Sequence, residues 1–247
     1  MSVTGCRKAQ GYEETTCSVS LDRAFREHWE MQCCGLLEMI KRNRTSGRPT
    51  KEDAELLSTM VLAAARAAFL EYGFKDASMS DIAARIGAAK PTIYKRYESK
   101  EVLLVAMIDA EVAKLERFVR KTTFTSGPTL ESLKAASWLV FEYTAAPEEL
   151  AFRKLLYGEA ATKPLIADRV LRWLGILKAP FEALVAKCQE AGHITSESSS
   201  KYFTDLLFDM ISGPLDRIAL ATTTPELEFL EQTFSARWRS FERVVRP

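Results

Sequence analysis

Apolar residues recur at helical spacing through most of this chain. Between Lys51 and Tyr72, for example, they stand three or four positions apart, which places them on one face of a helix. The same spacing returns in longer segments as far as residue 247, whereas the alternation of apolar and polar residues that is typical of strands is absent. Glycine and proline are few, with 11 and 9 residues. The pattern predicts an all-α protein.

Breaks in this pattern predict three parts. Residues 1–50 form an N-terminal extension with a basic arm at 41–51, where five basic residues and no acid occur. Residues 51–100 are predicted to form a compact domain of short helices, and residues 101–247 a larger helical domain. In the larger domain we expect helices to end at TSGP, TKP, EAGH, SGP and TTTP, which combine residues that terminate helices.

The stretch from Ser78 to Leu103 holds two short helical patterns and a tight turn. Ser78 is a good N-cap, and Asp81 three positions later completes a capping box. Only Gly87–Ala89 separates the first pattern from the second, which begins near residue 90 with an early proline. Two short helices joined by a three-residue turn that contains glycine are the signature of a helix-turn-helix.

The second helix of this motif has two distinct faces when residues advance by about 100° each. Ile93 and Tyr97, four positions apart, share the buried face. The opposite face carries a hydroxyl, a proline and two cations, groups that suit the major groove and the phosphates of DNA. Ser99 is expected to cap the next helix, with Lys100 beside a phosphate. The candidate DNA-binding residues are Arg48, Ser80, Lys90, Pro91, Thr92, Tyr94, Lys95, Arg96 and Lys100.

The basic face of the second helix and the basic segment before the motif each have an alternative interpretation. A basic face also occurs on surface helices whose charges are merely solvated, and the arm at 41–51 is either a solvated tail or a segment that lies along DNA. Residues 1–40 are an added helix, a disordered arm or residues upstream of a later start at Met31 or Met39. The tight turn, the basic face and the basic arm together favour DNA binding.

The stretch from Leu57 to Leu103 resembles the N-terminal domain of the tetracycline-repressor (TetR-type) transcriptional regulators. That family's first helix ends in F-x-x-x-G-[FY], which here is Phe69 to Phe74. The family's next motif is matched by Asp81-Ile82-Ala83, Gly87, Thr92-Ile93-Tyr94, Tyr97 and Ser99-Lys100. Ala88-Ala89 replace the commoner Val-Ser, so a hydroxyl that often touches phosphate is missing at Ala89. The resemblance implies DNA contacts by Thr92, Tyr94, Lys95 and Lys100, and a packing role for Tyr97.

The resemblance also implies a homodimer that binds a palindromic operator on double-stranded DNA and represses transcription. Two recognition helices must reach half-sites about 34–36 Å apart, and a twofold dimer needs a self-complementary apolar face. Two late helices are the candidates, with interface residues Phe203, Leu206, Leu207, Met210, Leu227, Leu230, Phe234 and Trp238. Burial of these side chains within one subunit is the alternative.

In TetR-type regulators the larger domain holds a pocket for a small-molecule effector, whose binding alters the spacing of the DNA-reading helices. Candidate pocket residues are Trp138, Phe141, Phe152, Tyr157, Trp173 and Phe181. Aromatic side chains between helices form apolar sites, although each of these six is also a normal core residue. No charged cluster identifies the effector.

The composition of the chain mainly excludes classes of partner, cofactor and function. The net charge of +1 predicts no global attraction to a polyanion, so a nucleic-acid site must be local. We expect no membrane partner, secretory signal, cofactor, metal site or catalytic residues: Gly-rich phosphate loops and metal-ligand spacings are lacking, and histidines number only two. The five cysteines are expected to be reduced thiols of a cytoplasmic, nucleoid-associated protein. The alternative function is a dimeric helical protein that binds small molecules without operator specificity.

Overall fold

A computed structural model describes residues 50–124, 127–221 and 225–247. Within these ranges the chain forms nine helices and no strand, so the predicted all-α class is confirmed. The chain divides into two units, Met1–Leu56 and Leu57–Pro247. No helix in the described ranges is long and apolar enough to cross a membrane. The candidate arm residue Arg48, four cysteines and the possible later starts lie outside the described residues.

Helix α2 (Lys51–Asp76) begins at a reciprocal cap and is kinked near its end. The Thr50 hydroxyl accepts from the amide of Asp53 at 3.1 Å, and the Asp53 carboxylate accepts from the amide of Thr50 at 3.0 Å. Gly73 has a φ of 76°, a backbone conformation that glycine adopts without strain, and it interrupts the regular helix three residues before α2 ends at Asp76. Tyr72, expected on the buried face, is instead 47% exposed, and its ring lies beside Arg85, whose guanidinium carbon is 5.5 Å from the ring centre.

The turn between α3 (Met79–Arg85) and α4 (Lys90–Arg96) follows from its sequence. Ser78 caps α3 by accepting from the amide of Asp81 at 3.1 Å, as predicted. Gly87 has a φ of 59°, and the amides of residues 87 and 88 donate to the carbonyls of residues 84 and 83. This pair of bonds is a Schellman motif, which ends a helix most easily at glycine. The predicted helix-turn-helix geometry is therefore present.

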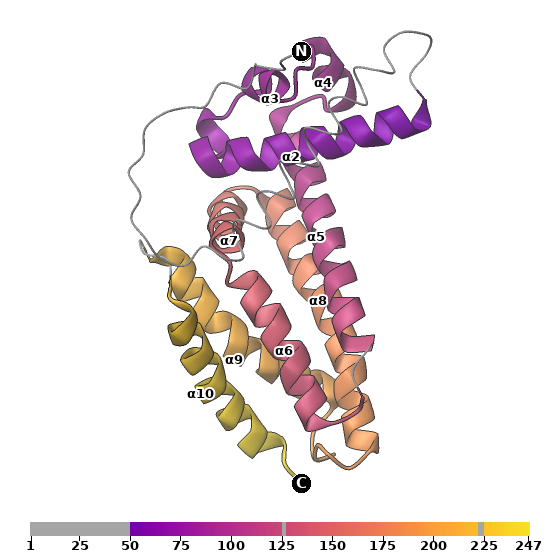
Figure 1. Cartoon of the computed structure of the whole chain (residues 1–247), viewed down its shortest axis with the longest axis vertical. Coiled ribbons are helices and arrows are strands. Elements are labelled where there is room, and N and C mark those ends of the chain that lie inside the picture. Colours follow the sequence, from indigo (N-terminus) through magenta and orange to yellow (C-terminus); the bar gives the residue numbers. More distant parts are fainter. Residues whose placement is uncertain (1–49, 125–126, 222–224) are drawn as a thin grey trace, which may run out of the picture. The chain divides into compact units, whose positions relative to one another are not determined.

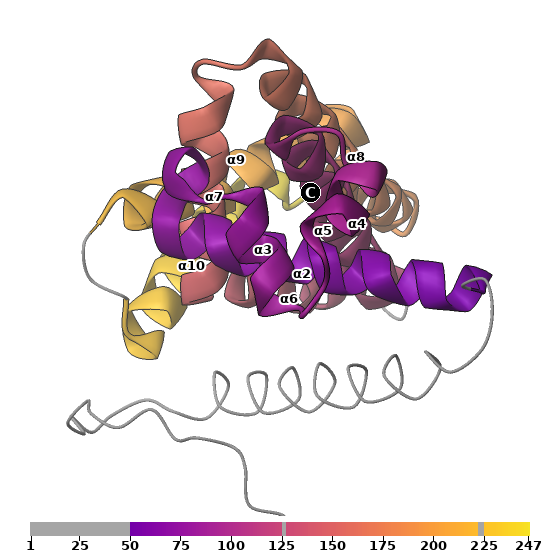
Figure 2. The same cartoon turned by 90° about the horizontal axis from the view of Figure 1, so that it is seen from above.

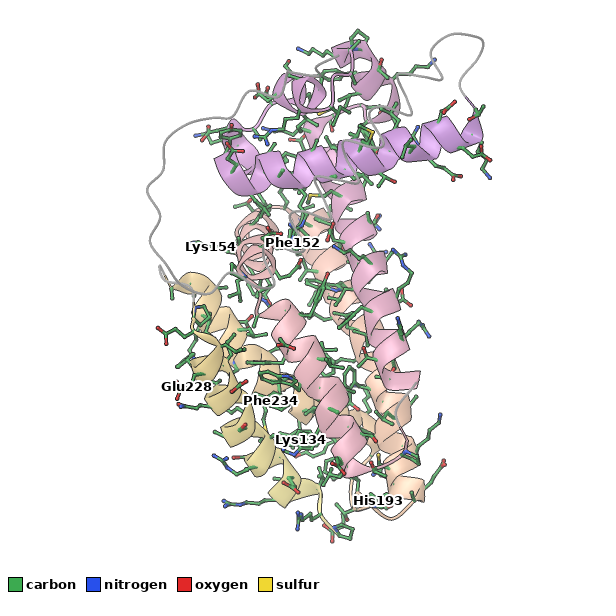
Figure 3. The ribbon with its side chains drawn as sticks, viewed as in Figure 1. Lys134, Phe152, Lys154, His193, Glu228 and Phe234 are labelled. Atoms are coloured by element: carbon green, nitrogen blue, oxygen red, sulfur yellow. The ribbon has the colours of Figure 1, made fainter. Side chains whose placement is uncertain are left out.

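The remaining helices are α5 (Lys100–Phe124), α6 (Leu130–Thr144), α7 (Pro147–Ala160), α8 (Pro164–Glu190), α9 (Ser200–Leu220) and α10 (Leu227–Val245). Figure 1 shows α5 running beside α8 and α9 beside α10, with α6 among them, in agreement with the contacts between these elements. Figures 1 and 2 show α3 and α4 at the end where α5 begins. An aromatic cluster joins α6 to α10, and Phe234 points from α10 toward α6 (Figure 3).

One predicted helix break is wrong. The SGP sequence at residues 212–214 lies inside α9, which continues to Leu220 with Pro214 buried. A proline inside a helix costs about 3 kcal/mol, but Pro214 is buried together with Ile211 and Leu215, so burial of apolar surface offsets the lost hydrogen bond. Pro180 is accommodated inside α8 in the same way. Breaks at TKP and EAGH are confirmed, since α7 ends at Ala160 and α8 at Glu190.

Candidate nucleic-acid interface and ligand cavity

Helix α4 presents one buried face and one solvent face. Ile93 and Tyr97 are 1% and 8% exposed, so they pack as predicted. The candidate contacts on the other side, Lys90, Pro91, Thr92, Tyr94, Lys95 and Arg96, are all exposed. Lys90 and Tyr94 lie together, with the Lys90 ammonium 5.6 Å from the centre of the Tyr94 ring. The arrangement offers DNA a hydroxyl, a phenol and three cations on one side of a short helix.

Lys100 occupies a different environment from these residues. Its ammonium donates to the carbonyls of Lys75 at 2.8 Å and Ala77 at 2.9 Å, and lies 4.7 Å from the centre of the Phe74 ring. These bonds fasten the start of α5 to the segment after the kink in α2. Because two of its three protons are used, Lys100 is held in place and has one proton left for a phosphate.

The flanking serines are placed as the motif requires. Ser80 lies exposed in the first turn of α3. Ser99 caps α5 by accepting from the amide of Val102 at 3.2 Å, which confirms the predicted cap.

An ion cluster that sequence reasoning missed connects α2 to α5 and α7. The Arg66 guanidinium bonds the Glu149 carboxylate at 2.9 Å, lies 3.6 Å from Glu148 and 3.7 Å from Glu111, and covers the Phe152 ring at 5.3 Å. Burial raises the pKa of Glu149, and Arg66 opposes that rise. The partners are more than 40 residues from Arg66 in sequence, so no local pattern predicts them.

The six predicted pocket residues are distributed over several environments. Phe141 and Trp173 line one small cavity. Phe152 lies under Arg66, and Phe181 packs edge-on against Phe208 with centroids 5.2 Å apart. Tyr157 is 38% exposed, and Trp138 is half-buried in the cluster that includes Phe234. The structure therefore brings two of the six to a cavity and places the others elsewhere.

The cavity that Phe141 and Trp173 line has a volume of about 30 Å³ and lies between α6, α7, α8 and α9. Its wall also contains Arg153, whose side chain is 9% exposed and whose Nη1 bonds Asp216 Oδ1 at 2.8 Å. The Tyr157 hydroxyl lies 3.2 Å from the same oxygen. The indole N–H of Trp173 is buried without an acceptor among the described residues. Arg153 was missed because nothing in its sequence neighbourhood marks an inward-facing arginine.

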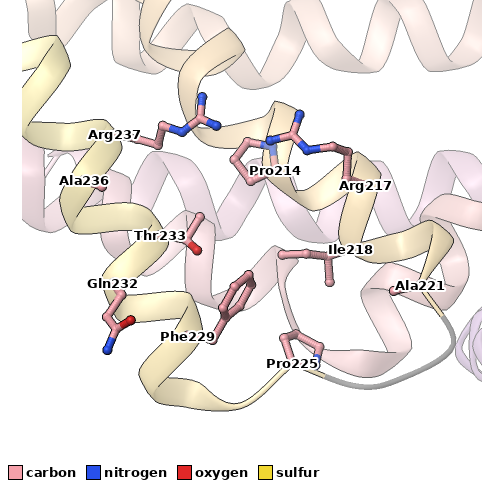
Figure 4. Close-up of a pocket in the computed structure, with 10 residues that line it drawn as sticks. All are labelled: Pro214, Arg217, Ile218, Ala221, Pro225, Phe229, Gln232, Thr233, Ala236 and Arg237. Atoms are coloured by element: carbon pink, nitrogen blue, oxygen red, sulfur yellow. The ribbon is translucent and has the colours of Figure 1, made fainter.

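The predicted dimer-interface residues divide by burial. Phe203, Leu207, Leu230, Phe234 and Trp238 are buried within the subunit, while Leu206 and Met210 are half-buried and Leu227 is exposed. The open face of α9 and α10 instead forms a groove of about 720 Å³. Phe229 and Ile218 lie toward one another across it, and Arg217 and Arg237 stand along one side (Figure 4). Sequence reasoning chose the inward stripe of these helices, because that stripe is the more regular one.

Other reactive groups in the described residues give no sign of a metal or redox centre. No cluster of histidine, cysteine, aspartate or glutamate side chains in this part of the chain is placed to hold a metal ion. Cys188 is a buried free thiol, and burial raises its pKa to about 11. A thiol with so little thiolate at neutral pH is a poor nucleophile.

Residues 61–107 match the family model described as bacterial regulatory proteins of the tetR family. The HTH-type transcriptional activator FasR of Mycolicibacterium smegmatis is 29% identical over 110 residues, which cover 44% of this chain and 50% of FasR. This match therefore spans only half the length of FasR. The HTH-type transcriptional regulator UidR of Escherichia coli is 26% identical over 199 residues, or 78% of this chain and 93% of UidR.

Solved structures of transcriptional regulators are similar to this chain in fold. A TetR-family transcriptional regulator from Mesorhizobium loti aligns with a TM-score of 0.72 and 20% identity, and the alignment covers 81% of this chain and all of that one. FadR from Bacillus subtilis, solved in complex with stearoyl-CoA, aligns with a TM-score of 0.64 and 14% identity over 76% of this chain and 99% of FadR.

Proposed function

We propose that this chain, a regulator of the TetR type, binds an operator on double-stranded DNA through α4 and is released from it by a small-molecule effector. The observation that carries the proposal is the exposed face of α4, where Thr92, Lys95 and Arg96 stand beside a helix-turn-helix corner. Neither core packing nor solubility requires cations and a hydroxyl on the outer side of this short helix. In this proposal Thr92 and Lys95 read base edges, while Lys90, Tyr94 and Arg96 bind phosphates.

The proposed operator is palindromic because the protein is proposed to act as a homodimer. The open groove between α9 and α10 leaves Phe229 52% exposed, and apolar surface of this kind is what a self-complementary interface covers. The interface then comprises the outward residues Leu206, Met210 and Phe229, while the inward aromatics hold α10 onto its own subunit. One copy of α4 from each protomer would enter successive major grooves.

The proposed response to an effector uses the cavity and the Arg66 cluster. Helix α7 contributes Arg153 to the cavity wall and Glu148 and Glu149 to the cluster around Arg66. A ligand that moved α7 would therefore act on α2, which packs in the same unit as α3 and α4. Such a ligand shifts the equilibrium only if its affinity differs between the two arrangements.

The remaining parts of the proposal follow from DNA binding. We place the protein in the bacterial cytoplasm, where its operator is, and assign it no catalytic step, because the named relatives are regulators. Repression is the proposed outcome, with activation as the alternative because FasR is named an activator. We also propose that residues 1–50 are an N-terminal extension, residues 51–100 the DNA-binding domain and residues 101–247 the ligand-binding and dimerisation domain.

The test is an in-vitro selection of the purified protein against random duplex DNA, with the mass of the protein measured in solution. Enrichment of an inverted repeat that is bound by a dimer would support the proposal. A stable dimer that enriches no sequence would favour the alternative, a helical small-molecule-binding protein without operator specificity. A monomer that binds half a palindrome would keep the DNA-binding assignment and remove the interface.

A further inference from the structure

The cavity between α6, α7, α8 and α9 has an apolar wall with a strongly asymmetric set of polar groups. Phe141, Leu177 and Phe208 are among its apolar residues. Its polar side chains are Arg153, Trp173, Thr144 and Ser212, and none of its lining residues is an acid. Arginine and the tryptophan N–H can only donate hydrogen bonds. An apolar wall with donors and no acid fits a ligand that carries acceptors and a negative charge.

Trp173 supplies a donor that lacks a partner. The residue is 8% exposed, and its indole N–H is buried with no acceptor among the described residues. Buried donors are nearly always paired in folded proteins, so an unpaired one beside a cavity points to a group that is bound only part of the time. An acceptor atom of a ligand would satisfy it.

Arg153 supplies the positive charge, and its counter-ion Asp216 is already partly hydrated. The Arg153 side chain is 9% exposed, whereas that of Asp216, its partner at 2.8 Å, is 43% exposed. A carboxylate that leaves this arginine regains hydration, while the arginine itself cannot. A second carboxylate entering from the cavity side would exchange for Asp216 without leaving the guanidinium unpaired.

Because the cavity is small, a ligand that enters it must move the helices that form its wall. A volume of about 30 Å³ is far below the roughly 150 Å³ of an engineered cavity that holds benzene, so any organic ligand must displace part of the wall. The bond between Arg153 and Asp216 ties α7 to α9, and its exchange would free α7 to move. The same helix holds Arg66 of α2 through Glu149. A ligand in the cavity would thereby act on α2, the helix that precedes α3 and α4.

We infer that the effector is an apolar monocarboxylic acid whose carboxylate takes Arg153 from Asp216 and accepts from the indole N–H of Trp173, while its apolar body enlarges the cavity. The inference rests on the proposed ligand response. It excludes amines, for which the wall has no acid, and sugars, for which it has too few polar groups.

The experiment measures binding of matched acid and amide probes to the full-length protein by calorimetry. The acids are benzoate, phenylacetate, 4-phenylbutyrate, hexanoate and decanoate, each compared with its primary amide at millimolar concentration. At least one acid is expected to bind roughly 10-fold or more tightly than its amide, because a charge-assisted pair is stronger than a neutral one. Equal binding of acid and amide throughout, or binding of none, overturns the inference.

Three variants locate the site. Arg153→Gln is expected to abolish the preference for acid over amide, and Trp173→Phe to weaken acid binding roughly 3- to 10-fold through loss of one hydrogen bond. Asp216→Asn, at an exposed position, is expected to tighten acid binding because it removes the competing carboxylate, and it serves if Arg153→Gln does not fold. Arg172→Gln, an exposed arginine of α8 outside the cavity, is the matched control. If the preference for acid over amide is unchanged both in Arg153→Gln and in Asp216→Asn, the assignment of the site to Arg153 is refuted.

Operator binding separates this inference from the proposed function. If the protein selects an operator but no acid is preferred, the ligand class is wrong and the regulator assignment stands. If an acid binds through Arg153 and no operator is selected, the ligand class stands and the DNA-binding assignment is wrong.

Discussion

Replacement of Arg66 by methionine tests whether the ion cluster around Arg66 stabilises the packing of α2 against α5 and α7. Methionine keeps an unbranched apolar side chain over the Phe152 ring and removes the charge. Three carboxylates, those of Glu111, Glu148 and Glu149, then lose their shared cation. We expect the variant to fold, to unfold more readily at pH 7, and to respond to pH differently from the wild type.

The magnitude follows from the exposure of each partner. Glu148 is 47% exposed and contributes little, whereas Glu149 and Arg66 are 18% and 15% exposed. Removal of one partner from a fully buried pair costs about 3–5 kcal/mol, and because this pair keeps some contact with water we expect about 1–3 kcal/mol.

The pH dependence has a definite sign. The pKa of Glu149 is raised above 4.5 in the folded protein, first by burial, so its protonated form favours folding and stability is lost as pH rises through that pKa. Arg66 offsets this loss by favouring the charged carboxylate. Without Arg66 the pKa of Glu149 rises further, so the difference in stability between variant and wild type is largest near pH 7 and shrinks below pH 4.5.

Urea unfolding followed by circular dichroism at pH 7 and pH 4 measures this difference. The matched control is Arg169→Met, which breaks a pair with Asp109 at 2.7 Å whose side chains are 32% and 46% exposed. The control is expected to cost less than about 1 kcal/mol. Equal losses in the two variants, or a loss in Arg66→Met that does not change with pH, would refute the assigned role of the cluster.

Three further predictions concern the turn, the dimer and the arm. Gly87→Ala is expected to lower the free energy of unfolding by about 1 kcal/mol, because φ at this position is 59°. Gly158→Ala inside α7 is expected to raise it by about 0.5–1 kcal/mol. Thermal unfolding measures both, and destabilisation by Gly87→Ala alone identifies backbone strain as the cause. Phe229→Asp is expected to yield monomers in sedimentation analysis, while Leu171→Asp, on exposed α8 surface, leaves the dimer intact; monomers in neither variant would remove the groove from the interface. Glutamine at the four basic residues of 41–48 should reduce the salt dependence of operator binding by about 0.9 in log–log slope for each phosphate that the arm no longer neutralises, and an unchanged slope would identify a solvated tail.

The helix-turn-helix could be predicted from sequence because its determinants are local. The bond between Ser78 and the amide of Asp81 spans three residues, and the positive φ of Gly87 ends α3 where the apolar spacing ends. Ile93 and Tyr97 are one helical turn apart and are both buried. Each of these features is decided within a few residues, so a pattern along the chain is sufficient to find it.

The cavity and the interface could not be predicted in the same way, because their determinants are distant in sequence. Arg153 meets Asp216 across 63 positions, and Arg66 meets Glu149 across 83. Phe234 and Trp238 form the stronger apolar stripe of α10, but that stripe packs within the subunit and leaves Phe229 outside. Lys100 is basic and follows a cap, and only the fold shows that carbonyls of Lys75 and Ala77 hold it.

The reading of DNA by α4 is tested by the affinity of Thr92→Ala and Lys95→Ala for the selected operator and for a scrambled duplex of the same length, with Lys154→Ala of α7 as the control. Both variants are expected to fold and dimerise, and each is expected to lose about 1–3 kcal/mol of preference for the operator, while the control keeps that preference. Unchanged preference in Thr92→Ala and Lys95→Ala would contradict the assignment of α4 as the helix that reads DNA.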